Sequence, residues 1–141
     1  MNHVNSPDNT DSAIEREIVA KGKTSPRVTP ADVHANIVSD FYFTAADGYI
    51  AVNCNESYPK PLDLLTFCVL VLRNGFTVTG ESACASPENF DPEIGRKIAR
   101  QNAEQKIWPL LGYELKTELA RPVLTQADAD ADLAGTPRPS K

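Results

Sequence analysis

Residues 64–82 read LLTFCVLVLRNGFTVTGES, and this stretch decides the fold class. Two runs rich in β-branched and large apolar residues, Leu64–Leu72 and Phe76–Ser82, flank the dipeptide Asn74-Gly75. Asn-Gly between two such runs is the strongest short-range signal for an antiparallel hairpin. The stretch therefore predicts two paired strands joined by a tight turn.

The length of the loop fixes which side chains share a face, because side chains alternate along a strand. A two-residue loop places the following pairs opposite one another: Arg73 and Phe76, Val71 and Val78, Val69 and Gly80. The face expected to point to the core then carries Phe67, Val69, Val71, Phe76 and Val78. The other face carries Leu70 and Leu72 beside Thr77, Thr79 and Glu81. It is half apolar, so we expect the N-terminal segment or a second copy of the chain to cover it.

Helices are expected on both sides of the hairpin. Thr29-Pro30-Ala31-Asp32 has the composition of a helix start, and it predicts a helix over 30–41. The apolar face of that helix is expected to hold Val33, Ile37, Val38 and Phe41. After a single turn at Ser86-Pro87, Asp91-Pro92 predicts the start of a long helix over 92–119. Pro109 should bend this helix near Trp108, because proline removes one backbone hydrogen bond.

The remaining segments are polar or rich in turn-forming residues. Residues 47–61 are predicted to form a loop, with a short extended piece at Tyr49–Val52. Residues 1–11 and 122–141 are predicted to be disordered, and a short helix over 13–21 is expected between a Ser12–Glu15 capping box and Gly22. The prediction is one α+β domain over 24–121 with disordered termini: a helix, an antiparallel β-hairpin and a long C-terminal helix kinked near Pro109.

Composition excludes several classes of function. The chain has 141 residues and a net charge of −5, so it lacks the basic excess typical of proteins that coat nucleic acid. The longest apolar run, Leu64–Leu72, is too short to cross a bilayer, so no membrane association is expected. The start of the chain lacks the features of a signal peptide, which favours the cytoplasm. Cys54, Cys68 and Cys84 are not spaced as metal ligands or as a disulfide framework, and no cofactor is expected.

Several blocks of the sequence resemble a known family. They are Arg27–Asp32, Ile37–Ser39, Tyr42-Phe43, Asn74–Cys84, Pro87–Asp91, Ile94–Ala99, Asn102-Ala103, Trp108 and Gly112-Tyr113. Over residues 26–119 the chain resembles the small tailed-phage proteins typified by the gene 49 product of coliphage N4 and the gene 66 product of Shigella phage Sf6. This resemblance implies a phage or prophage gene expressed in the bacterial cytoplasm, and an accessory protein rather than a part of the virion. It implies no catalytic residue.

One candidate site lies where the second strand ends. Glu81, Ser82 and Cys84 belong to a Gly80–Cys84 segment that partly matches the G-x-S-x-G turn of a nucleophile elbow. His34 is a candidate base for Ser82 or Cys84, but no orienting acid is indicated. The alternative interpretation is that these small residues let the chain pack closely as it leaves the sheet. Glu81, Glu88, Asp91 and Glu93 lack the spacing of a known cation site.

A second candidate site lies on the long helix. Arg96, Lys97 and Arg100 form a basic patch that suits an anion. Glu93 and Glu104 stand four residues from Lys97 and Arg100, so a salt-bridged helix face is the competing interpretation. Polar residues close to this patch are also candidates for contacts: Asn89 as a turn former, and Asn102 as a hydrogen-bond donor to the chain after the hairpin.

These observations favour a non-enzymatic binding module that acts on a host protein or a small anionic ligand through the 81–100 segment. The candidate binding residues are Glu81, Ser82, Cys84, Asn89, Arg96, Lys97 and Arg100. The alternatives are a small enzyme that uses Cys84 or Ser82, and a specific nucleic-acid binder that uses the Arg96, Lys97 and Arg100 face. A homo-oligomer is compatible with each of these three functions.

Overall fold

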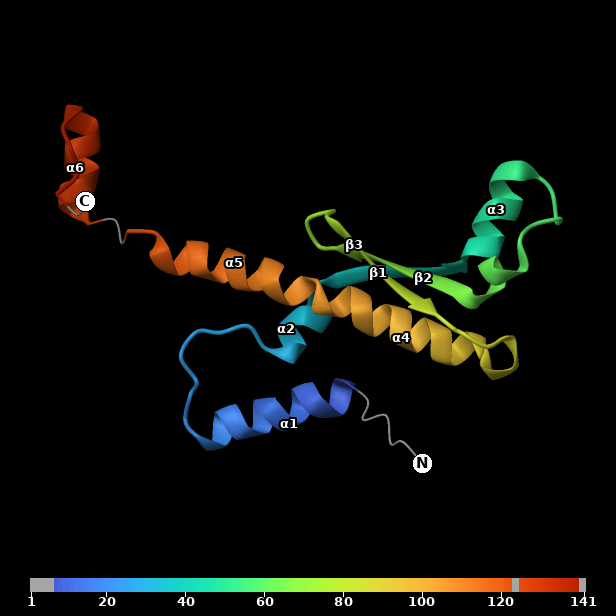
Figure 1. The fold of residues 1–141 in the computed structure, drawn as a ribbon. Coiled ribbons are helices and arrows are strands. Elements are labelled where there is room, and N and C mark those ends of the chain that lie inside the picture. Colours follow the sequence, from blue (N-terminus) through green and yellow to red (C-terminus); the bar gives the residue numbers. More distant parts are fainter. Residues whose placement is uncertain (1–6, 123–124, 140–141) are drawn as a thin grey trace.

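The computed structural model describes residues 7–122 and 125–139 of the chain, and its centre is an antiparallel sheet of three strands. The strand order is β1 (Ile37–Thr44), β2 (Leu65–Leu72) and β3 (Thr77–Ala83). Helix α4 (Pro92–Gln105) packs against β3 and β2 on one face of this sheet (Figure 1). We call this covered face the inner face. The predicted α+β fold class is confirmed.

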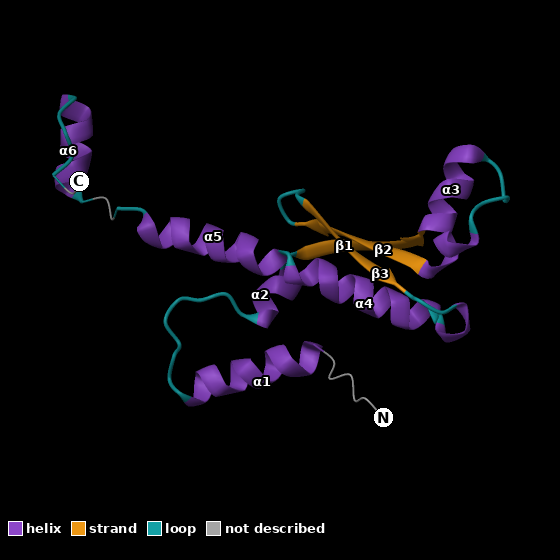
Figure 2. Cartoon of the chain, in the orientation of Figure 1, coloured by secondary structure: helices purple, strands orange, loops and turns teal. Residues whose placement is uncertain are grey.

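Figure 2 shows the other elements, most of which lie beyond the ends of this sheet. They are α1 (Pro7–Ala20), α2 (Pro30–Ala35), α3 (Ala45–Asn53), η1 (Lys60–Leu64), η2 (Pro87–Asn89), α5 (Ile107–Ala120) and α6 (Gln126–Ala134). Helix α2 packs against the start of α5, while α3 packs against η1 at the far end of the sheet. No helix within these described ranges is long and apolar enough to span a membrane.

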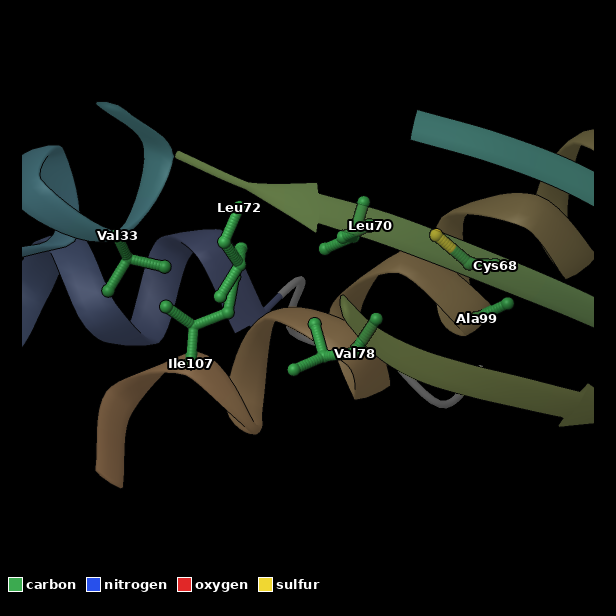
Figure 3. Close-up of a cluster of buried hydrophobic side chains, with 8 residues drawn as sticks. Val33, Cys68, Leu70, Leu72, Val78, Ala99 and Ile107 are labelled. Atoms are coloured by element: carbon green, nitrogen blue, oxygen red, sulfur yellow. The ribbon is translucent and has the colours of Figure 1, made fainter. Parts of the chain in front are cut away.

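The core lies between the inner face of the sheet and the helices beneath it (Figure 3). The buried side chains are Val33, Cys68, Leu70, Leu72, Val78, Ala99, Ala103 and Ile107. Small residues bring α4 close to β3, because a Cβ atom added at Gly80 would clash with the backbone of both Ala99 and Ala103. The fold therefore depends on the absence of a side chain at Gly80.

The predicted hairpin is present, but its predicted register is wrong by one residue. Val71 pairs with Thr77, Leu70 with Val78, and Cys68 with Gly80. The loop contains three residues, because the N–H of Leu72 bonds the carbonyl of Phe76 and Gly75 adopts a φ of 86°. A residue with positive φ after a tight turn is typical of a three-residue hairpin loop.

The shifted register reverses the two faces of β2, since side chains alternate along a strand. Cys68, Leu70 and Leu72 point into the core and are almost fully buried. Phe67, Val69 and Val71 were predicted to lie in the core, but they lie on the opposite face and are only partly buried. Phe76, also predicted for the core, lies between the three-residue loop and the start of β3 and is 55% exposed. On β3, Val78 is buried as predicted.

The predicted helix over 30–41 is wrong beyond its first turn. Thr29 and Asp32 form the expected capping box, and α2 then ends at Ala35. The chain continues as β1, so Ile37, Val38 and Phe41 belong to a strand. The segment IVSDFYFT is rich in β-branched and aromatic residues, which favours a strand, and pairing with β2 supplies its hydrogen bonds.

The predicted loop over 47–61 is wrong over 47–53, which α3 (Ala45–Asn53) occupies, and over 60–61, where η1 begins; residues 54–59 lie outside helices and strands as predicted. The helix begins at a second capping box, made by Thr44 and Asp47. It includes Tyr49–Val52, which was predicted to be extended, and it ends where Cys54 adopts a left-handed conformation with a φ of 51°.

The long C-terminal helix is kinked as predicted. Asp91 caps α4 by accepting hydrogen bonds from the N–H groups of Glu93 and Ile94. The regular helix is interrupted at Lys106, three residues before Pro109, and the axis from Pro92 to residue 120 bends by 21°. A break on the N-terminal side of a proline is expected, since the proline ring leaves the preceding turn without one hydrogen bond.

Both ends of the described chain contain more helix than the sequence predicts. Helix α1 begins at Pro7, so the expected start at the Ser12–Glu15 capping box is wrong. The Glu15 side chain accepts two hydrogen bonds of 2.6 Å from Arg27 instead. Helix α6, capped by Thr125 and Asp128, lies in the tail predicted to be disordered. The rest of the predicted disorder, over residues 1–6, 123–124 and 140–141, falls outside the described residues.

Candidate binding surfaces

The face of the sheet opposite α4, which we call the outer face, carries apolar residues from all three strands. The strand register assigns its residues as Ser39, Phe41, Phe43, Leu65, Phe67, Val69, Val71, Thr77, Thr79, Glu81 and Ala83. Within the described part of the chain, no helix runs across this face, because α4 lies on the inner face and α3 touches only one end (Figure 2). Contiguous exposed apolar surface on a small domain marks a site of interaction.

Three phenylalanines form a row on the outer face. The ring centroids of Phe41 and Phe43 are 5.6 Å apart, and those of Phe43 and Phe67 are 5.2 Å apart. The row arises because Phe43 pairs directly with Phe67 across β1 and β2, while Phe41 lies two residues earlier on the same face. Phe41 is 61% exposed. Ring pairs at this spacing are held in place by mutual contact, so the row presents a preformed aromatic surface.

A hollow of about 810 Å³ continues the outer face at its far end. Leu65 and Ala83 belong to both the outer face and the lining of this hollow. The other lining residues come from η1 and from the segment after β3: Lys60, Pro61, Leu62, Asp63, Leu64, Cys84, Ala85 and Pro87. The outer face and the hollow together make one continuous apolar surface.

The candidate binding residues from Glu81 to Asn89 do not share one surface. Glu81 lies on the outer face, and its carbonyl accepts a hydrogen bond of 2.8 Å from Asn102, which therefore bonds β3 itself and not the loop after the hairpin. Ser82 lies on the inner face opposite Thr66. The thiol of Cys84 donates to the carbonyl of Ser86 over 3.2 Å. Asn89 lies exposed in η2.

Arg100 is not a free cation for a ligand. Its guanidinium donates to Asp40 at 2.9 Å, to Glu104 at 2.8 Å and to the hydroxyl of Tyr42 at 3.2 Å. The carboxylate of Glu104 also lies 3.7 Å from Nε2 of His34. Arg100 therefore ties β1 to α4, and its place in the predicted anion patch is not supported.

This network changes the acid–base properties of its members. Burial would lower the pKa of Arg100, but its hydrogen bonds with Tyr42 and Glu104 outweigh burial and raise that pKa above the ordinary value. Burial also raises the pKa of the Tyr42 hydroxyl, against the opposing effect of Arg100. Burial likewise raises the pKa of the Cys68 thiol. The groups are fixed in a structural role, with Arg100 charged and both Tyr42 and Cys68 protonated at neutral pH.

The two other basic residues of the patch differ from one another. Lys97 lies 3.3 Å from Glu93, in the salt bridge that the sequence predicts. Arg96 is exposed and has no hydrogen bond or ion pair within the described residues. Of the three predicted cations, Arg96 is the one left for a ligand.

The catalytic alternative is not assembled. His34 lies in α2 beside Glu104, whereas Cys84 and Ser82 lie at the end of β3, near the opposite end of α4 (Figure 1). A nucleophile and its base must lie within hydrogen-bond reach, and these groups do not. In the described ranges, no group of three or more histidine, cysteine, aspartate or glutamate side chains is placed to hold a metal ion.

The fold and its surfaces define a small α+β protein with one sheet face covered by α4 and one that no helix of residues 7–122 or 125–139 crosses, held by a bent C-terminal helix. Residues 28–119 match the Phage protein (N4 Gp49/phage Sf6 gene 66) family, and the chain belongs to this family. The match includes all three strands, both halves of the bent helix and the two surfaces described above. The search of curated proteins and the search of solved structures both returned no match.

Proposed function

We propose that this phage-family protein is a non-enzymatic binding module whose outer face docks onto a protein of the bacterial host. The observation that carries the proposal is the row formed by Phe41, Phe43 and Phe67 on a sheet face that no described helix covers. Burying such side chains gives about 1.5–3 kcal/mol each, which is enough for a few of them to anchor an interface.

The chemistry of the outer face favours a protein over a nucleic acid. Surfaces that bind single strands combine stacked aromatic rings with a groove of lysine and arginine. None of the outer-face positions described above is basic, and the one charged residue there is the acidic Glu81. A phosphate backbone would be repelled, whereas an apolar patch on a protein would bury the same rings without an unpaired charge.

The cytoplasm of the infected cell is the proposed site of action. All three cysteines, Cys54, Cys68 and Cys84, are free thiols, which suits a reducing compartment. An enzymatic role is not part of the proposal, because the candidate nucleophiles and His34 lie apart.

The test is capture of host proteins by the immobilised full-length chain, with Phe41→Ser compared against wild type. Phe41 is 61% exposed, so its replacement removes apolar contact surface with little effect on the core. Tyr113→Ser is the matched control, since Tyr113 is an aromatic residue on α5 that is 78% exposed and lies outside the outer face.

The expected result is a host protein retained by wild type and by Tyr113→Ser and lost from Phe41→Ser, with Kd raised about tenfold or more in a titration with the purified partner. Equal retention by Phe41→Ser would overturn the proposal. Sedimentation of the free chain separates the competing occupant: a dimer of wild type that Phe41→Ser abolishes would show that a second copy covers this face.

A further inference from the structure

A smaller hollow, of about 110 Å³, lies between the end of β1 and the first turns of α4. Its apolar lining includes Phe43 and Phe90, and its polar lining includes Arg96, Thr44 and Thr66. The hollow is large enough for a single carboxylate or phosphate group, and it is separate from the 810 Å³ hollow at the end of the outer face.

Arg96 supplies an unused positive charge to this hollow. It is exposed and makes no ion pair or hydrogen bond with any described residue, while its neighbour Lys97 is paired with Glu93. A guanidinium presents a planar set of donors that matches the oxygens of carboxylate and phosphate. Arg96 is therefore a cation that lines this hollow and has no ionic partner among the described residues.

Two hydroxyl groups add donors on the strand side. Thr44 accepts the N–H of Asp47 over 3.1 Å, which leaves its own hydroxyl hydrogen available. Thr66 is 3% exposed, and its Oγ1 has no hydrogen-bond partner within the described residues. A buried hydroxyl without a partner is costly, so a ligand oxygen that reaches Thr66 from the hollow would satisfy a group left without a partner among the described residues.

One acidic residue opposes an anion here. Asp47 lines the same hollow, and its carboxylate accepts the N–H of Thr44 at 2.9 Å. Asp47 has a structural reason to be present, as the capping partner of α3. Its charge should weaken the binding of an anion. Removing the charge of Arg96 should therefore weaken binding, and removing the charge of Asp47 should strengthen it.

From the unpaired Arg96, the unsatisfied Thr66 hydroxyl and the shape of the cavity between them, we infer that this hollow binds a small oxyanionic group, a carboxylate or a phosphate. The group sits among Arg96, Thr44 and Thr66, in a hollow that Phe43 and Phe90 also line. Phe43 borders both this hollow and the outer face, but the groups that carry the inference, Arg96, Thr44 and Thr66, lie outside the outer face, so either site can fail without the other.

The experiment is an NMR titration of the full-length chain with inorganic phosphate and, separately, with acetate, at constant ionic strength. The two arms show which oxyanion geometry the hollow accepts. Four proteins are compared: wild type, Arg96→Gln, Asp47→Asn and Lys97→Gln. Lys97→Gln is the matched control, because it removes an equal charge from the next residue of the same helix. Thermal melting of each variant confirms that it is folded.

The expected result is saturable binding of one probe to wild type, with shifts of the amides near Thr66 and Arg96. Arg96→Gln should weaken binding about tenfold, Asp47→Asn should tighten it about threefold, and Lys97→Gln should leave it within about twofold. The inference is overturned if neither probe saturates wild type in the millimolar range, if Lys97→Gln weakens binding as much as Arg96→Gln, or if Asp47→Asn fails to tighten it.

Discussion

The close packing of α4 on β3 makes Gly80→Ala the most informative single change to the fold. A Cβ atom at Gly80 would fall within 3.0 Å of backbone atoms of both Ala99 and Ala103, closer than real Cβ atoms approach. Both obstacles are backbone on successive turns of α4, so no side-chain rotation relieves the clash and the helix itself must move. Overpacking of a core costs about 1–3 kcal/mol, and a clash with helix backbone belongs at the upper end or beyond it. We expect Gly80→Ala to lower the free energy of unfolding by about 3 kcal/mol.

Gly112→Ala is the matched control for this prediction. Gly112 lies in α5, and nothing stands within 4 Å of the position its Cβ would take. Alanine in an open helical position is favoured over glycine by about 1 kcal/mol, so the same chemical change should stabilise the chain there. For a domain of this size, a loss of 3 kcal/mol corresponds to a fall in Tm of about 12–24 °C. Urea denaturation and calorimetry measure both variants. A Gly80→Ala protein within about 1 kcal/mol of wild type would refute the packing described here.

Three further predictions concern the interior and the N-terminal helix. Thr66→Val replaces a buried, unpartnered hydroxyl by a methyl group of the same shape, so urea denaturation without added anion should show equal stability or a gain of about 1 kcal/mol; a loss larger than that would reveal a partner for Thr66. Thiol labelling followed by mass spectrometry should modify exposed Cys54 first and buried Cys68 last, because burial both shields the Cys68 thiol and raises its pKa; equal rates would contradict that burial. The hydrogen bond from Arg27 lowers the pKa of Glu15 below 4.5, so the docking of α1 is stabilised above about pH 4.5 and loosens as the pH falls through the lowered pKa. An NMR titration should show this, and Arg27→Gln should raise that pKa; an unchanged Glu15 titration in this variant would argue against the ion pair.

The sequence predicted the hairpin because both of its signals are local. Asn74-Gly75 marks a reversal of the chain whatever the rest of the protein does, and β2 and β3 lie within two residues of the predicted strands. The register is not local in the same way. A loop of two residues and a loop of three residues both suit Asn-Gly, and they differ by the one residue that exchanges the faces of β2. Both faces of β2 carry apolar residues. Its composition alone therefore does not indicate which of the two registers, and which face toward the core, is correct.

The start of β1 was mistaken for a helix because its signals favour both structures. The capping box at Thr29 and Asp32 is real and predicts a helix start, but it says nothing about length. Ile37, Val38 and Phe41 happen to extend the helical spacing that begins at Val33. The strand forms because β2 offers an unpaired edge, and that edge lies about thirty residues further along the sequence. The helical spacing of apolar residues is realised only in the short helix α2. Pairing with β2 makes the residues that follow a strand.

Strand β1 also explains why neither surface could be found correctly from the sequence. Its outward residues, Phe41 and Phe43, complete the aromatic row with Phe67. Its inward residues, Asp40 and Tyr42, engage Arg100. Once β1 is in place, Arg100 becomes part of the fold, and Arg96, one turn earlier, is the cation of the predicted patch that has no partner in the described ranges. The ion pair from Arg100 to Asp40 spans sixty positions of the sequence, and only the paired strand brings the two groups together. The sequence shows that α4 carries a basic patch. Which of these basic residues can bind a ligand depends on β1, a strand that the local sequence pattern does not predict.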